Sequence, residues 1–183
     1  MRIQIILGST RDGRKGIMVA DWVNGLAKGR SDAEYEFLDL KAWDLPFYND
    51  PKNPDSGEYS FDYTKKWSEK ISEGDGYLII TPEYNHGYPA PLKNALDLLY
   101  KEWNNKPVAF ISYGGSAGGA RAAEQLKQVA VELEMVPLQT GINLVKFTQM
   151  FDELKNIKDP ALNDRVNKLF DELVKWTEKL KSV

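Results

Sequence analysis

A set of short, almost continuously apolar segments limits the possible folds more than any other feature of this chain. They occupy residues 2–7 (RIQIIL), 76–80 (GYLII) and 108–113 (VAFISY). Strands buried on both faces have this composition, and such strands are typical of parallel sheets. Two weaker candidates lie at 35–40 (YEFLDL) and 136–144 (VPLQTGINL), the second interrupted by Pro137 and Gly141. The sequence therefore predicts a sheet of five strands.

Between these segments, apolar residues recur at spacings of three and four, which is typical of amphipathic helices. The pattern predicts helices over residues 17–27, 92–103, 122–133 and 162–180, with a weaker case at 61–73. Strand–helix alternation repeated five times predicts a doubly wound α/β fold with helices on both faces of a parallel sheet. We expect one domain over residues 1–183, with its ligand outside the carboxyl ends of the strands.

Composition argues against several classes of function. The chain has 24 Lys and Arg against 27 Asp and Glu, a net charge of −3, which is not the basic balance of a nucleic-acid binder. With no cysteine and one histidine, neither a disulfide nor a Cys- or His-rich metal site is expected. The sequence shows no signal-peptide pattern and no apolar run of membrane-spanning length, which predicts a cytoplasmic protein.

The loop after the first strand, residues 8–16 (GSTRDGRKG), combines hydroxyls, cations and glycines before a predicted helix. These are the components of a phosphate site, where backbone N–H groups at a helix N-terminus face an anion. The glycine spacing fits neither GxGxxG nor a complete Walker A motif, because Arg14 and Lys15 replace the required Lys and Ser/Thr. The sequence favours a metal-free site for a phosphate monoester over a basic, solvated turn.

The loop after the third strand begins the segment PEYNHGYPAPLKNALD, residues 82–97. Its three prolines stiffen the backbone, so that its amides can meet a flat polar ligand at low entropic cost. Tyr84, His86 and Tyr88 offer stacking surfaces, and Asn85 can donate and accept hydrogen bonds. The alternative is that the prolines only end the strand while the tyrosines cap the core.

The loop after the fourth strand, residues 113–121 (YGGSAGGAR), places four glycines within residues 114–119. Glycines let a ligand lie against bare backbone, although glycine-rich turns are common by themselves. Together, the three loops would provide a phosphate site, a flat polar wall and a glycine floor. Flavin mononucleotide (FMN) needs all three.

The segments GSTR, PEYNHGYPAPLKNALD and YGGSAGGAR resemble the NAD(P)H-dependent FMN reductases, which include flavodoxin-like quinone, azo-dye and chromate reductases. The resemblance covers about residues 1–150 and implies a flavodoxin-like sheet of order 2-1-3-4-5. It also implies bound FMN, NAD(P)H as co-substrate and a small-molecule electron acceptor. Members are usually homodimers or tetramers, with the helix at 92–103 in the interface and the 41–60 loop near the partner's flavin.

The resemblance implies particular contacts as well. The phosphate would be held by Ser9, Arg11 and the segment Arg14, Lys15, Gly16 and Ile17. The ring edge would lie along Pro82, Glu83, Tyr84 and Asn85, and its far side along Tyr113, Gly114 and Gly115. Many members have serine near position 16, so Gly16 is a departure, for which we expect Arg14 and Lys15 to compensate.

Electron transfer through a flavin needs few side chains, because the cofactor carries the chemistry. No residue is assigned as catalytic, and His86 and Tyr88 are candidates for the substrate pocket. His86 would shape the rim of that pocket or donate a proton to the acceptor. Two other functions stay open: a flavodoxin-type electron carrier, and a flavin-gated regulatory protein that binds a partner through Trp43, Phe47 and Tyr48. The loop at 41–60 that carries these aromatics is either a mobile surface loop or a cover for a site or partner.

Overall fold

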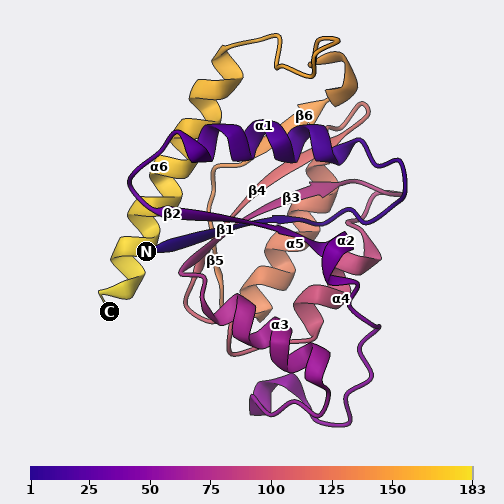
Figure 1. Ribbon diagram of the computed structural model, residues 1–183, viewed down its shortest axis with the longest axis vertical. Coiled ribbons are helices and arrows are strands. Elements are labelled where there is room, and N and C mark those ends of the chain that lie inside the picture. The colour runs from indigo at the N-terminus through magenta and orange to yellow at the C-terminus, as the bar shows by residue number, and fades with distance from the viewer. Residues whose placement is uncertain (183) are drawn as a thin grey trace.

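The apolar segments form a parallel sheet at the centre of the computed structural model, which describes residues 1–182 (Figure 1). The strands are β1 Arg2–Leu7, β2 Glu34–Asp39, β3 Gly76–Pro82, β4 Pro107–Gly114, β5 Val136–Pro137 and β6 Ile142–Val145. Their order is β2-β1-β3-β4-β5, with β6 also paired with β4. This is the flavodoxin-like order, which confirms the predicted fold.

The fifth position of the sheet is divided between β5 and β6. Proline has no N–H for a sheet ladder, and β5 ends at Pro137 after pairing with the start of β4. The chain then leaves the ladder and returns at Ile142, which lies opposite Ile111. The interruption predicted from Pro137 and Gly141 is therefore real.

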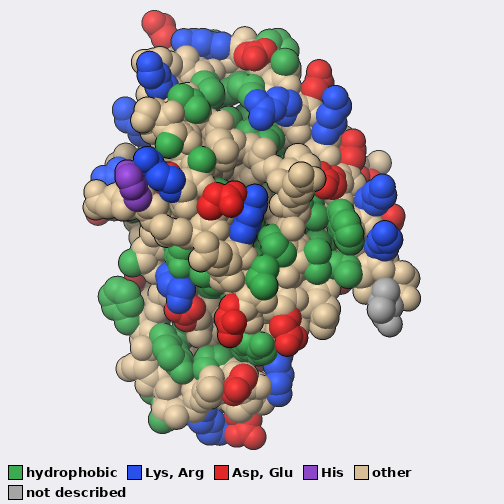
Figure 2. All heavy atoms as spheres, turned by 180° about the vertical axis from the view of Figure 1, so that it is seen from behind, with side chains coloured by type: hydrophobic (Ala, Val, Ile, Leu, Met, Phe, Trp, Pro, Cys, Tyr) green, Lys and Arg blue, Asp and Glu red, His purple; other side chains and the backbone are tan. Residues whose placement is uncertain are grey.

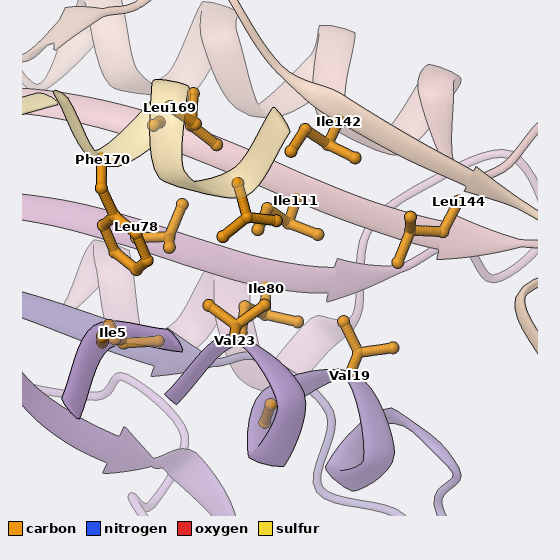
Figure 3. Close-up of a cluster of buried hydrophobic side chains, with 14 of the residues drawn as sticks. Ile5, Val19, Val23, Leu78, Ile80, Ile111, Ile142, Leu144, Leu169 and Phe170 are labelled. Carbon is orange, nitrogen blue, oxygen red and sulfur yellow. The ribbon is translucent and has the colours of Figure 1, made fainter. Parts of the chain in front are cut away.

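Helices cover both faces of the sheet. They are α1 Gly16–Lys28, α2 Leu40–Trp43, α3 Asp62–Ser72, α4 Ala90–Asp97, α5 Ala120–Glu132 and α6 Ala161–Lys181, with 3₁₀ turns at Pro54–Ser56 and Phe147–Gln149. One core packs α1 and α6 on the sheet, and the other packs α3, α4 and α5 on the opposite face. Figure 3 shows Val19 and Val23 of α1 near Ile80, with Leu169 and Phe170 of α6 on the same face. None of the helices within residues 1–182 has the length and apolar character that a membrane crossing requires.

The helix predicted over residues 92–103 is shorter than expected, because α4 covers only its first half. The cause is tertiary. The indole N–H of Trp67 donates to the Ala95 carbonyl (2.8 Å), and that of Trp103 donates to the Leu96 carbonyl (3.1 Å). The Leu96 carbonyl also accepts from the Leu99 N–H (3.4 Å), three residues on instead of the four of an α-helix. The chain therefore continues in tighter turns that still bury the predicted apolar side chains.

The connections after β1 and β3 diverge and so position the site. The two strands are neighbours, but β1 leads to α1 on one face while β3 leads to α4 on the other. The Gly8 N–H donates to the Ile80 carbonyl (2.9 Å), which keeps the two strand ends together. A crevice opens at such a switch point, outside the carboxyl ends of the strands.

The half-buried Lys106 lies just before β4, at the end of the strands opposite the crevice, and it leads to a prediction about stability. Its ammonium donates to the Tyr77 hydroxyl (3.1 Å), and burial lowers the pKa of Lys106 to about 8. Above that pH the folded state releases a proton that the unfolded state keeps up to its ordinary pKa, so this group makes stability rise with pH. Between about pH 7.5 and 9.5, we expect wild type to gain about 1 kcal/mol of unfolding free energy relative to Lys106→Met. Urea titrations at the two pH values measure this difference, and equal changes in both proteins would contradict it.

Candidate active site

A cavity of about 480 Å³ lies at the carboxyl ends of β1, β3 and β4, where the three predicted loops meet. It is lined by Ser9, Arg11, Gly13, Arg14, Lys15, Gly16, Pro82, Glu83, Tyr84, Tyr113, Gly114, Gly115, Lys146, Phe147, Thr148 and Gln149. The structure thus brings together all of the residues predicted to bind the cofactor except Ile17 and Asn85. Ile17 packs partly against the core beneath α1, and Asn85 is exposed.

Tyr84 ties the first loop to the second. Its hydroxyl shares a hydrogen bond with the buried Ser9 hydroxyl (3.0 Å) and accepts one from Arg11 Nε (3.1 Å). The Arg11 guanidinium also lies 5.5 Å from the centre of the Tyr84 ring, within the range of a cation–π contact. The loops after β1 and β3 therefore form one wall of the cavity.

Arg14 lines the cavity as expected, but its guanidinium is already engaged. It forms an ion pair with Asp39 at the end of β2, including a hydrogen bond of 2.7 Å, and it also donates to the Ser9 carbonyl. The Arg14 side chain is only 11% exposed. This arrangement gives Arg14 a role in holding the loop, which does not support the expectation that it compensates for a missing serine hydroxyl. Arg11, Lys15 and Lys146 have no ion pair within residues 1–182.

Residues 84–87 form a tight turn at the tip of the second loop. The N–H of Tyr84 donates to the Gly87 carbonyl (2.8 Å), and the Gly87 N–H donates back to the Tyr84 carbonyl (3.0 Å). Asn85 (φ 50°) and His86 (φ 69°) between them both have left-handed backbones, as a type I′ turn requires. Such backbones are uncommon for residues other than glycine and often occur at functional sites.

Neither of the two substrate-pocket candidates lines the cavity. His86, the chain's one histidine, lies on the outer surface, where its side chain is purple in Figure 2. Tyr88 is half-buried and packs against the core below α4, and burial raises the pKa of its hydroxyl. Any contact of these two side chains with a substrate would have to be made from outside the cavity described above.

Glu83 joins the second loop to the third. Its side chain is only 6% exposed, and its carboxylate accepts hydrogen bonds from Arg121 Nε (2.6 Å) and from the Arg121 backbone N–H (3.1 Å). The hydrogen bond from the Arg121 side chain is the main reason that the pKa of Glu83 lies below its ordinary value. Glu83 therefore stays ionised and holds the N-terminus of α5 against the cavity wall, so it is poorly placed to exchange protons with a substrate.

A fourth loop, which the sequence reasoning missed, contributes Lys146, Phe147, Thr148 and Gln149. It follows β6, whose end lies at the same edge of the sheet as the other loops, and the Lys146 N–H donates to the Gly115 carbonyl (2.9 Å). The rule that ligands bind at the carboxyl ends of strands could have predicted it. The interrupted pattern at 136–144 hid where the fifth strand position ends.

Tyr113 has an unusual environment at the cavity. Its hydroxyl is buried near the Ser9 hydroxyl and makes no hydrogen bond of ordinary geometry within residues 1–182. Leaving such a group unpaired costs about 1–3 kcal/mol, so an orphaned hydroxyl calls for a partner from outside the chain. Burial raises the pKa of Tyr113, which keeps the hydroxyl protonated and able to donate.

The geometry suits an anionic, partly planar ligand. The lining carries four cations, and its one acid, Glu83, is neutralised by Arg121. Gly114 and Gly115 offer bare backbone, and a side-chain atom added at Gly115 would meet nothing within 4 Å. Cations beside the N-terminus of α1 mark the anion end, and the Pro82–Tyr84 backbone forms a stiff wall along the rest.

Comparison with known proteins identifies relatives of this chain. A protein of Schizosaccharomyces pombe named NAD(P)H-dependent FMN reductase is 40% identical over 171 residues, or 84% of this chain and 85% of its own length. An NADPH:quinone oxidoreductase of Arabidopsis thaliana is 32% identical over 80% of this chain and 76% of its own length. The solved structure of FerB from Paracoccus denitrificans, a flavoenzyme NAD(P)H:(acceptor) oxidoreductase, matches with a TM-score of 0.77 and 27% identity over 97% of each chain.

The family model described as NADPH-dependent FMN reductase matches residues 1–149, which contain all of the lining residues of the cavity. The chain belongs to the NADPH-dependent FMN reductase family.

Proposed function

We propose that the cavity holds FMN and that the protein uses it to pass two electrons from NAD(P)H to a small acceptor. As a member of this family the chain is an NAD(P)H-dependent reductase. The bound flavin, its contacts and the acceptor are the proposed parts. Quinones are the first acceptors to test, since a relative is named for them, with azo compounds, free flavin and metal oxyanions next.

The residues present fit FMN. The cavity falls in the range of about 300–1,000 Å³ that is usual for small-molecule sites. A phosphate would meet Arg11, Lys15 and the first turn of α1, while a flat ring would lie between the Pro82 segment and Gly114–Gly115. The single observation that carries the proposal is this convergence of a cationic end, a stiff wall and a glycine floor in one cavity.

Bound FMN would supply the hydride chemistry at its ring, and the chain's own residues would position and shield it. Tyr84, through Ser9 and Arg11, fixes the phosphate end relative to the ring wall. The Glu83–Arg121 pair fixes that wall relative to α5. We propose that His86 and Tyr88 contact the incoming acceptor from outside this cavity, and that Asn85 and Ile17 act through their backbones.

The test is anaerobic stopped-flow mixing of the FMN-loaded protein with NADPH. We expect the flavin absorbance to bleach, and to return when a benzoquinone is added in a second mixing step. A protein that binds FMN and exchanges electrons with a one-electron donor, yet is not bleached by NADH or NADPH, would be a flavodoxin-type carrier. A purified protein that gains no flavin absorbance with added FMN would contradict the whole proposal.

We further propose that the chain acts as one flavin-binding domain and assembles as a dimer or tetramer through the α4 side. Both cores share the same sheet, which supports a single unit. The half-buried Tyr100 and Val129 lie beside α4, and the exposed side chains of Phe47 and Tyr48 lie in the 41–60 loop. Sedimentation velocity of the wild type tests the assembly, and a monomer at micromolar concentration would contradict it.

A further inference from the structure

The hydroxyl of Tyr113 fills the space that a side chain at position 16 would occupy. A Cβ added at Gly16 would lie 1.9 Å from the Tyr113 hydroxyl oxygen and 2.5 Å from the ring carbon that bears it. No side chain can coexist with the hydroxyl at such distances. The first residue of α1 must therefore be glycine for the tyrosine to reach the start of that helix.

The Tyr113 ring is held in this position from the other side. The side chain is 4% exposed, and its ring centre lies 4.7 Å from that of Phe147 in the loop after β6. The neighbouring Ser9 hydroxyl lies close enough to lower the pKa of Tyr113 slightly against the effect of burial, but its hydrogen bond of ordinary geometry is made with Tyr84. The hydroxyl is thus fixed, buried and without a partner, at the edge of the cavity.

The surroundings of the hydroxyl identify the ligand group that it would meet. It lies at the first residue of α1, where helix N–H groups face outward, and Arg11 and Lys15 line the same cavity. A protonated hydroxyl beside cations and helix amides is a donor for an anionic oxygen. A phosphate monoester offers several such oxygens.

We propose that the Tyr113 hydroxyl donates a hydrogen bond to the phosphate of bound FMN, and that Gly16 exists to leave room for it. The inference rests on the proposed function, because it needs FMN in this cavity. It assigns Tyr113 to the phosphate end of the site, whereas the resemblance placed it beside the ring. The loop after β4 would then contact both ends of the ligand, through Tyr113 at one and Gly114–Gly115 at the other.

The experiment compares FMN with riboflavin, which has the same ring and no phosphate. Dissociation constants are measured by flavin fluorescence titration of apo wild type, Tyr113→Phe and the remote control Tyr35→Phe, whose hydroxyl lies near the start of β2 beside Arg30 and Asp32. We expect Tyr113→Phe to bind FMN about 10-fold more weakly and riboflavin within about twofold of wild type, since only a hydrogen bond to a charged group is lost. Tyr35→Phe should change neither constant.

Two further measurements separate this role from a structural one. Without flavin, Tyr113→Phe should be at least as stable to urea as wild type, since it removes an unpaired buried hydroxyl. The ³¹P NMR signal of bound FMN should shift in Tyr113→Phe and stay in place in Tyr35→Phe. Gly16→Ser should weaken FMN binding by displacing the tyrosine, and Gly16→Ser/Tyr113→Phe should recover part of the loss.

The possible results also separate the inference from the proposed function. If wild type binds FMN more tightly than riboflavin and Tyr113→Phe keeps the same preference, the inference is wrong while the proposed function stands. If wild type binds neither flavin, the proposed function is wrong and takes the inference with it. A Tyr113→Phe protein that loses FMN and riboflavin equally would show a role in shaping the cavity, which also overturns the phosphate contact.

Discussion

Replacing Gly119 by alanine is expected to lower the free energy of unfolding by about 3 kcal/mol. Gly119 has a φ of +85°, and an added Cβ would lie 2.7 Å from the Ser112 Cβ and 2.9 Å from the Tyr113 backbone nitrogen. Neither atom is the end of a flexible side chain. Left-handed strain accounts for about 1–2 kcal/mol and the forced repacking for a further 1–3 kcal/mol.

Gly115→Ala is the matched control for this change. The two glycines belong to the same loop, but a Cβ at Gly115 meets no atom within 4 Å and its φ is not in the left-handed region. Its urea unfolding should stay within about 0.5 kcal/mol of wild type. Equal destabilisation by the two substitutions would show that the strain at Gly119 does not determine the stability of this loop.

Arg14→Ala is expected to lower the free energy of unfolding by about 3 kcal/mol. Such a loss would show that Arg14 mainly stabilises the fold. Its removal leaves the mostly buried Asp39 carboxylate with the Lys41 backbone N–H as its remaining donor, and it leaves the Ser9 carbonyl without the guanidinium. Breaking a buried pair from one side costs about 3–5 kcal/mol, and the part exposure of Asp39 places this pair at the lower end. Urea unfolding of the flavin-free protein measures the effect.

Lys15→Ala provides the comparison, because Lys15 is exposed and has no ion pair within residues 1–182. It should keep its stability within about 0.5 kcal/mol while FMN binding weakens with the loss of one cation. Arg14→Ala/Asp39→Ala should be more stable than Arg14→Ala alone, since the stranded carboxylate is gone. If Arg14→Ala keeps full stability and loses only FMN affinity, the original assignment of Arg14 to the phosphate is the better one.

Most of the architecture can be read from the sequence because it depends on short-range patterns. The buried runs of β1, β3 and β4 and the helical spacing between them determine the sheet and its covering helices. The predicted loops meet at the cavity because the strand ends of a parallel sheet share one edge. Gly8, Pro82 and Gly114 mark those strand ends in the sequence itself.

The differences between prediction and structure arise from contacts between residues far apart in the chain. The indole groups of Trp67 and Trp103 engage the carbonyls that α4 would need to continue. Asp39, 25 positions from Arg14, decides where that guanidinium points. The fit of Tyr113 into the space beside Gly16 spans 97 positions (113 minus 16), and no local spacing could indicate it.

The divided strand at the edge of the sheet affects how copies of this protein can meet. An uninterrupted edge strand presents a row of free N–H and C=O groups that can recruit a strand from another molecule. Here β5 stops at Pro137, which has no N–H, and β6 covers only Ile142–Val145. Neither piece is long enough to template a continuous intermolecular ladder. This edge is thereby less open to strand addition than the opposite edge, which the uninterrupted β2 forms.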